Sequence, residues 1–133
     1  MKSIFLPAIV LIVIFSFSCS KDKTNPILNT EDSISFQGTF KLPLTDSVAG
    51  TVALHVSDGY YVCNTNLPYG YGAGELVVQE KTLNFIDTLF FVIPAIYGPS
   101  YVLSGEYNYE FDGENLKISR ELDNGSLTYS MKR

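Results

Sequence analysis

Short stretches of alternating apolar and polar residues, separated by Asp-Gly and Asn-Gly pairs, run through the C-terminal part of the chain. Such alternation is typical of strands with one buried face. Asp112-Gly113 and Asn124-Gly125 favour tight two-residue loops, because these residues tolerate positive φ. They divide the region into a meander of three antiparallel strands. The residues expected on its buried face are Tyr107, Tyr109, Phe111, Leu116, Ile118, Leu122, Leu127, Tyr129 and Met131.

One charged residue, Arg120, is in phase with this apolar face. The Asn124-Gly125 loop would place it opposite Tyr129. We expect Arg120 at a sheet edge or barrel rim, with its stem on the tyrosine and its guanidinium in water. The register at the first turn stays open, because a two-residue slip between Asp112 and Asn115 leaves every side chain on its face.

Earlier segments repeat the pattern. Residues 34–42 alternate strictly, and Pro43 ends that strand because proline has no N–H to donate. The Asp58-Gly59 loop sets Val56 opposite Tyr61 and Leu54 opposite Cys63 on the core face. The same register puts His55 opposite Val62 on the outer face.

Two further strands are expected around a Glu80-Lys81 turn, with Leu76 and Val78 facing Leu83 and Phe85. Leu89–Ile93 reads as a short apolar strand that Pro94 closes. The fold class is therefore all-β, an antiparallel meander of about eight or nine strands. Such a meander closes into a small barrel or folds into a β-sandwich, because open edges invite aggregation. We favour the barrel.

The N-terminus has a different character. Lys2 precedes a nearly unbroken apolar run, Ile4–Phe17, which ends at Ser18 and Cys19. A spanning helix needs about 20 apolar residues, so this run suits the hydrophobic region of a cleaved signal peptide. A polar segment follows Cys19 directly and continues to Asp32.

The segment that ends in Ser18-Cys19 resembles the lipobox of bacterial lipoproteins, particularly those of the Bacteroidetes type. The resemblance implies cleavage before Cys19 and acylation of that cysteine by chains such as palmitate. It also implies an outer-membrane location, and Ser20-Lys21-Asp22 resembles a signal for surface exposure. A periplasm-facing position is the alternative. The expected organisation is a signal peptide at 1–18, a lipidated flexible tether at 19–32 and a single β domain at 33–133.

The strand number, the meander order and Gly38-Thr39-Phe40 in the first strand resemble small lipocalin-like domains. That family has Gly-x-Trp at this position, and this chain has no Trp. The resemblance implies a barrel that could carry a small apolar ligand. The residues alone favour a bulge or bend in a long first strand as the reason for Gly38.

Nothing in the chain has the pattern of a catalytic or metal centre. His55 is the only histidine, and no Gly-x-Ser-x-Gly sequence accompanies it. Cys63 is expected to be an inert core thiol. With Cys19 committed to lipid, a structural zinc site lacks ligands. We therefore predict no enzyme activity, no cofactor and no metal.

The formal net charge of −5, with no basic stripe, argues against nucleic-acid binding. The segment Asn64–Gly74 is rich in Tyr, Gly and Asn, as recognition loops are. Tyr69 and Tyr71 in this segment, together with Tyr97 in a second loop, are the candidate ligand-binding residues. The predicted function is a lipid-anchored, non-catalytic module that binds an envelope glycan, peptide or protein. A lipocalin-like carrier of a small apolar ligand is the alternative.

Overall fold

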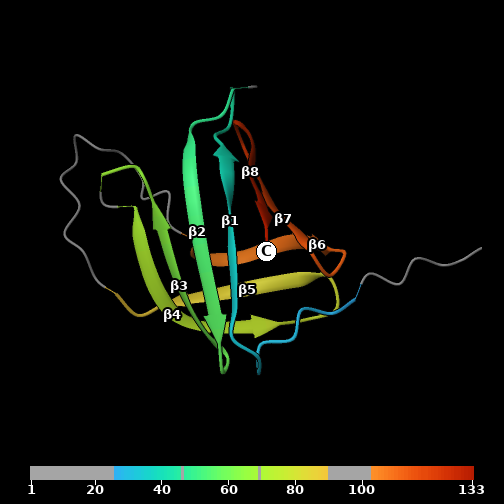
Figure 1. The fold of residues 1–133 in the computed structure, drawn as a ribbon. Coiled ribbons are helices and arrows are strands. Elements are labelled where there is room, and N and C mark those ends of the chain that lie inside the picture. Colours follow the sequence, from blue (N-terminus) through green and yellow to red (C-terminus); the bar gives the residue numbers. More distant parts are fainter. Residues whose placement is uncertain (1–25, 46, 69, 90–102) are drawn as a thin grey trace, which may run out of the picture.

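The protein folds as a closed barrel of eight antiparallel strands in simple meander order (Figure 1). The computed structural model describes residues 26–45, 47–68, 70–89 and 103–133. Each strand pairs with its neighbours in sequence, and β1 pairs with β8 to close the barrel. The strands are β1 (Ile34–Lys41), β2 (Gly50–Ser57), β3 (Tyr60–Thr65), β4 (Tyr71–Val78), β5 (Thr82–Asp87), β6 (Gly105–Phe111), β7 (Asn115–Leu122) and β8 (Gly125–Lys132).

The predicted all-β barrel is therefore confirmed, and the β-sandwich alternative is not adopted. Within the described ranges the chain contains no helix with the length and hydropathy that a membrane crossing requires. Of the expected strand Leu89–Ile93, only Leu89 is described, and it lies outside any strand. The remaining residues of that segment fall outside the described part of the chain.

The β2–β3 hairpin has the predicted register. Val56 pairs with Tyr61, Leu54 with Cys63, and His55 with Val62. Asp58 and Gly59 have φ angles of 52° and 76°, as a two-residue loop that follows the strand twist requires. The β4–β5 hairpin also matches the prediction around its Glu80-Lys81 turn.

The two C-terminal turns differ from the expected ones by one residue each. Phe111 pairs with Leu116, so the first loop is Gly113-Glu114, which is the register that a two-residue slip produces. The carboxylate of Asp112 stabilises this loop by accepting hydrogen bonds from the backbone N–H groups of Glu114 and Asn115, at 2.9 and 2.6 Å. Asp112 therefore precedes the loop instead of occupying it.

The second turn consists of Asp123 and Asn124, because Leu122 pairs with Gly125. Arg120 consequently lies opposite Leu127, and its predicted position opposite Tyr129 is wrong. Gly125 has a φ of 122° at the start of β8, a conformation that glycine adopts without strain.

The environment of Arg120 also differs from the prediction. Its guanidinium carbon lies 4.5 Å from the centre of the Tyr107 ring, and its Nη1 donates a hydrogen bond of 2.8 Å to the carbonyl oxygen of Ser104. The Nε atom is buried. Arg120 is half-buried and lies two residues from the loop end of β7, near the predicted rim, but its aromatic partner is Tyr107 instead of Tyr129.

Large aromatic side chains fill the barrel. Phe85 makes edge-to-face contacts with Tyr61 and Tyr107, at centroid distances of 4.9 and 5.7 Å, and Phe40 stacks on Tyr129 at 5.5 Å. Each such pair contributes about 0.5–1.5 kcal/mol beyond area burial. These contacts occupy the space that a carried ligand would need.

The end of the expected tether belongs to the folded domain. Leu28 is only 2% exposed and lies in the core, and the carbonyl oxygen of Thr30 accepts a 3.2 Å hydrogen bond from the N–H of Gly59. The expectation of a flexible tether through residue 32 therefore needs correction from Leu28 onward. The physical reason is that an apolar side chain in an otherwise polar segment finds a place among the core residues.

The barrel has two different ends. At the hairpin end lie the short turns β2–β3, β4–β5 and β6–β7 together with residues 27–33 (Figure 1). At the loop end lie the β1–β2 and β3–β4 connections, the end of β5, the start of β6 and the β7–β8 turn. Among the described residues, the exposed large apolar side chains near this end are those of Leu44, Val48, Tyr71, Ile86 and Leu122.

Candidate functional site

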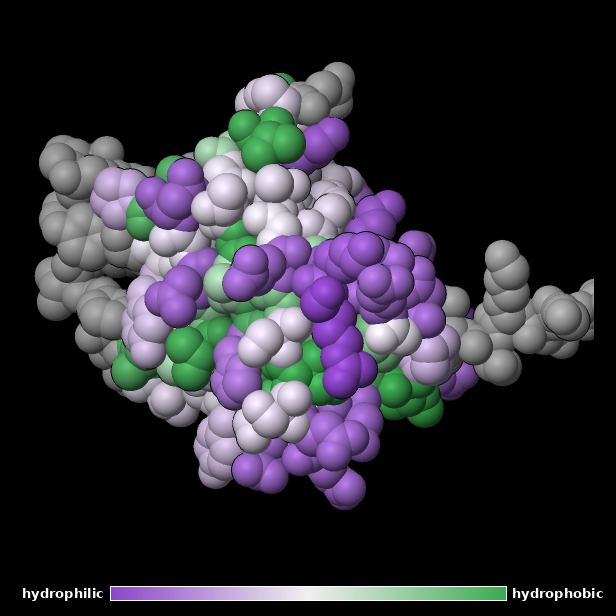
Figure 2. Space-filling model, in the orientation of Figure 1, coloured by the Kyte–Doolittle hydropathy of each residue, from purple (hydrophilic) through white to green (hydrophobic). Residues whose placement is uncertain are grey.

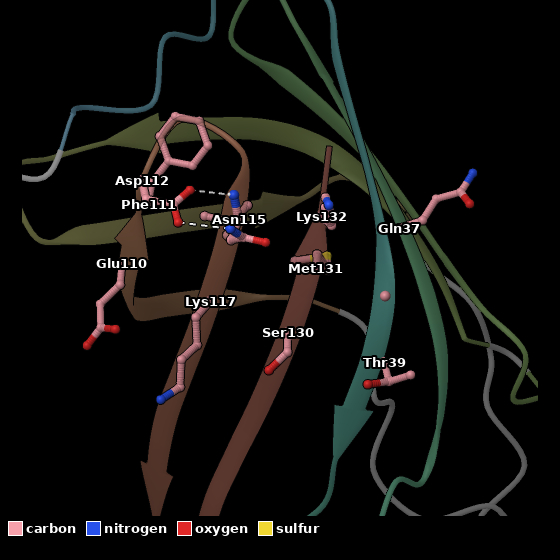
Figure 3. Close-up of a pocket in the computed structure, with 12 residues that line it drawn as sticks. Gln37, Thr39, Glu110, Phe111, Asp112, Asn115, Lys117, Ser130, Met131 and Lys132 are labelled. Carbon is pink, nitrogen blue, oxygen red and sulfur yellow. Dashed lines mark hydrogen bonds between the residues drawn. The ribbon is translucent and has the colours of Figure 1, made fainter.

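A groove of about 560 Å³ opens on the outside of the barrel where β1 meets β8, and we call it the seam groove. Strands β1, β6, β7 and β8 contribute its walls (Figure 3). Its lining residues are Gln37, Gly38, Thr39, Glu110, Phe111, Asp112, Asn115, Leu116, Lys117, Ser130, Met131 and Lys132.

Three core residues contribute to the lining of the seam groove. Phe111, Leu116 and Met131 belong to the core, and their side chains are at most 7% exposed. Phe36 packs edge to face on Phe111, at a centroid distance of 5.9 Å, and fixes the position of that ring. Figure 2 shows hydrophobic residues in the middle of the face that Figure 1 presents, with hydrophilic residues around them.

Gly38 is essential for the close pairing of β1 with β8. A Cβ atom at this position would overlap the carbonyl oxygen of Ser130 on β8. The pairing of β1 with β2 runs without interruption through Gly38, so the residue does not form a bulge. Close approach of two strand backbones is the reason for this glycine.

Polar side chains make up much of the lining of the seam groove. Gln37 and Thr39 lie on β1 and Ser130 lies on β8, where the three supply amide and hydroxyl groups (Figure 3). Glu110 and Lys117 are cross-strand partners on β6 and β7 and place opposite charges along one wall. This combination can hold a ligand that offers both hydrogen-bonding groups and a small apolar surface.

The hairpin-side end of the groove is held by two interactions. Asn115 donates a 2.9 Å hydrogen bond from Nδ2 to the Asp112 carboxylate (Figure 3). The hydrogen bonds from Asn115 and Glu114 hold the pKa of Asp112 down at about 2. Lys132 forms a 3.0 Å ion pair with Glu114, and both side chains are well exposed. The Asp112 turn is thus built to keep a charged carboxylate.

A second open groove, of about 650 Å³, lies on the other side of β1. It shares Gln37 and Gly38 with the seam groove and continues over β2 and β3, where Thr51, Asn64 and Asn66 line it. Asn66 is fixed in place because its Oδ1 accepts a 2.8 Å hydrogen bond from the N–H of Thr51. Amide and hydroxyl groups therefore extend the polar surface around the barrel.

The residues predicted to bind ligand are not brought together in the described part of the chain. Tyr71 is the first residue of β4, pairs with Asn64, and is 38% exposed on the outer face. Tyr69 and Tyr97 lie outside the described residues, as does Cys19. The expected long loop is also shorter, because β4 begins at Tyr71 and the 2.7 Å hydrogen bond from the N–H of Thr65 to the carbonyl of Gly70 closes the turn.

The two residues with reactive side chains have the surroundings that the sequence predicts. His55 is exposed on the outer face of β2 and lies 2.8 Å from the hydroxyl of Ser35 through its Nδ1. Cys63 is fully buried, and burial raises its pKa to about 12. A thiol with such a pKa stays protonated at neutral pH and is a poor nucleophile.

Buried tyrosines surround this thiol inside the barrel. Burial raises the pKa of Tyr61, Tyr107 and Tyr129, so their hydroxyls stay neutral. Tyr61 donates a 2.9 Å hydrogen bond to the carbonyl of Leu103. The barrel interior therefore contains packed aromatic rings whose hydroxyl groups carry no charge.

In the described ranges no group of His, Cys, Asp and Glu side chains could hold a metal ion. A scan of protein-family models and searches of curated proteins and of solved structures found no match. The candidate site therefore rests on the geometry of this chain alone.

Proposed function

We propose that the protein is a lipid-anchored cell-envelope lipoprotein whose barrel is a non-catalytic binding module. The lipid is carried by Cys19 and holds the protein in the outer membrane, exposed at the cell surface. The ligand is an envelope glycan or peptide, bound in the seam groove. The supporting observation is that amide and hydroxyl side chains and two opposite charges line one groove, next to residues of the core.

The alternative, a carrier of a small apolar ligand inside the barrel, has less support. The side chains of Tyr61, Phe85 and Tyr107 contact one another across the interior and are each at most 1% exposed. An eight-stranded barrel has room for side chains or for one small ligand. The packing of this barrel favours the first arrangement.

Binding can be tested with the chain from residue 19 onward, carrying Cys19→Ser to prevent acylation. A panel of envelope glycans and peptides is titrated while backbone NMR shifts are recorded. A ligand of the seam groove shifts the amides of Thr39, Lys117 and Ser130 first. A ligand that shifts only β3–β5 amides contradicts the proposed site.

Matched substitutions then measure the contribution of the groove. Glu110→Gln removes a charge from its wall, and Glu106→Gln removes one from the same strand outside it. Hydrogen bonds to charged groups contribute about 1.5–3 kcal/mol, so we expect Glu110→Gln to weaken binding by roughly tenfold or more. Equal effects of the two variants would contradict the proposal.

A blocking substitution provides an independent test. Ser130→Arg puts a long side chain into the groove, whereas Ser126→Arg puts the same side chain on β8 outside it. We expect loss of binding only for Ser130→Arg, with both variants folded as judged by far-UV circular dichroism.

A further inference from the structure

The way the N-terminal segment joins the barrel gives the domain a defined orientation on a membrane. We infer that the hairpin end of the barrel faces the lipid headgroups and that the loop end, with Leu44, Val48 and Leu122, is presented away from the membrane. This inference rests on the proposed acylation of Cys19.

The first support is the site at which the chain enters the fold. Leu28 is buried in the core, and the carbonyl of Thr30 is held by the N–H of Gly59 in the β2–β3 turn. Residues 28–30 are therefore fixed at the hairpin end. An anchor on this segment pulls on that end of the barrel and on no other.

The second support is the length of the connection. Seven residues lead from Cys19 to Pro26, and a fully extended chain of seven residues spans at most about 25 Å. Strands of eight residues extend over about 26 Å. The connection therefore keeps residue 26, and with it the hairpin end, within about 25 Å of the bilayer surface.

The exposed surface of the hairpin end is mixed. It presents charged side chains of both signs, among them Asp58, Glu80, Lys81 and Lys132, which suit a layer of hydrated headgroups. Exposed apolar side chains occur at both ends of the barrel, with Ile27 (64%) and Tyr60 (59%) at the hairpin end and Leu44 (84%) and Val48 (54%) at the loop end. The orientation therefore rests on the site at which the chain enters the fold and on the length of the connection.

Leu44, at the loop end, has an unusual backbone conformation. Its φ of 66° is in the left-handed region, which costs a branched residue about 1 kcal/mol or more. Its side chain is nevertheless almost fully exposed at the tip of the β1–β2 connection. On the membrane-distal side, this side chain is accessible to molecules that approach from the solvent.

The orientation can be measured with the full, acylated protein in vesicles that contain a nitroxide-labelled headgroup lipid. Glu80→Cys and Asp123→Cys place a fluorophore on exposed turns at the hairpin end and the loop end, and both remove one acidic residue. Buried Cys63 does not react with the label. We expect severalfold stronger quenching at position 80 than at position 123.

The possible results are distinguishable. If the protein floats with the vesicles but both positions are quenched equally, or position 123 more strongly, the orientation is wrong while the lipid anchor stands. If the unlabelled protein does not float with the vesicles, both proposals fail. Insertion of 20 Gly and Ser residues between Asn25 and Pro26 must retain flotation and remove the difference in quenching; a difference that persists would show that the short connection does not set the orientation.

Discussion

Gly38 on β1 lies against the backbone of Ser130 on β8, so closely that a Cβ atom on residue 38 would overlap the Ser130 carbonyl oxygen. The first and last strands close the barrel at this contact, and the seam groove opens beside it. The contact therefore links the closure of the fold to the candidate site.

Gly38→Ala is expected to destabilise the protein strongly, because the obstructing atom belongs to a backbone and cannot rotate away. The expected loss in the free energy of unfolding is about 3 kcal/mol, at the upper end for overpacking substitutions. Urea unfolding measures it. Gln37→Ala, a neighbouring exposed position, provides the control, and equal losses for the two variants would contradict the role given to the seam.

Leu28→Ala tests whether the N-terminal segment is part of the folded domain. Removal of a buried leucine side chain costs about 2–5 kcal/mol. Ile27→Ala changes an exposed neighbour and should stay within about 0.5 kcal/mol of the wild type. A Leu28→Ala variant as stable as Ile27→Ala would contradict this placement and would mean that residues 26–32 belong to the flexible tether.

The Asp112 carboxylate predicts a specific loss of stability in acid. Its pKa is lowered to about 2 in the folded protein from an ordinary value of 3.8, by the hydrogen bonds from Asn115 and Glu114. The charged form therefore favours folding above about pH 4, and this contribution disappears as the pH falls toward 2. An NMR titration of the carboxyl carbon should give the low pKa, and Asp112→Asn should flatten the pH dependence of stability in this window.

The Cys63 thiol should be unreactive in the folded protein. The side chain is fully buried, so a reagent cannot reach the sulfur atom. Its pKa is raised to about 12, so the thiol stays protonated at neutral pH. In the chain from residue 19 with Cys19→Ser, a disulfide reagent should titrate no thiol without denaturant and one thiol in urea. Glu80→Cys supplies an exposed thiol as the positive control, and rapid reaction of Cys63 in the native protein would contradict the described core.

Local patterns predicted most of the barrel. Alternation and the Asp58-Gly59 pair gave the register of β2 with β3, because a slip by one residue would expose Leu54 and Val56. They did not decide the two C-terminal turns, where slips by two residues keep all faces. Arg120 was misplaced because the β7–β8 turn differs by such a slip. At the β6–β7 turn, the hydrogen bonds of Asp112 identify the loop that forms.

The seam groove could not be predicted because it depends on contacts between the two ends of the chain. Thr39 and Ser130 pair across β1 and β8, and no local pattern relates residues so far apart. Gly38 was a signal for close backbone approach, but the sequence could not say which strand approaches. Leu28 was missed because a single apolar residue in a polar segment has no periodicity.

Acylation at Cys19 is measured by the intact mass of the protein extracted from the outer-membrane fraction of cells that express the full chain, and of its Cys19→Ala variant. Acyl chains contribute about 0.8 kcal/mol per buried CH₂, so two or three chains hold a protein firmly. We predict a chain that begins at Cys19 and carries the mass of diacylglycerol or more, and no mature Cys19→Ala protein in that fraction. A wild-type protein without added lipid, or a Cys19→Ala variant found there in full at the wild-type mass, would contradict this prediction.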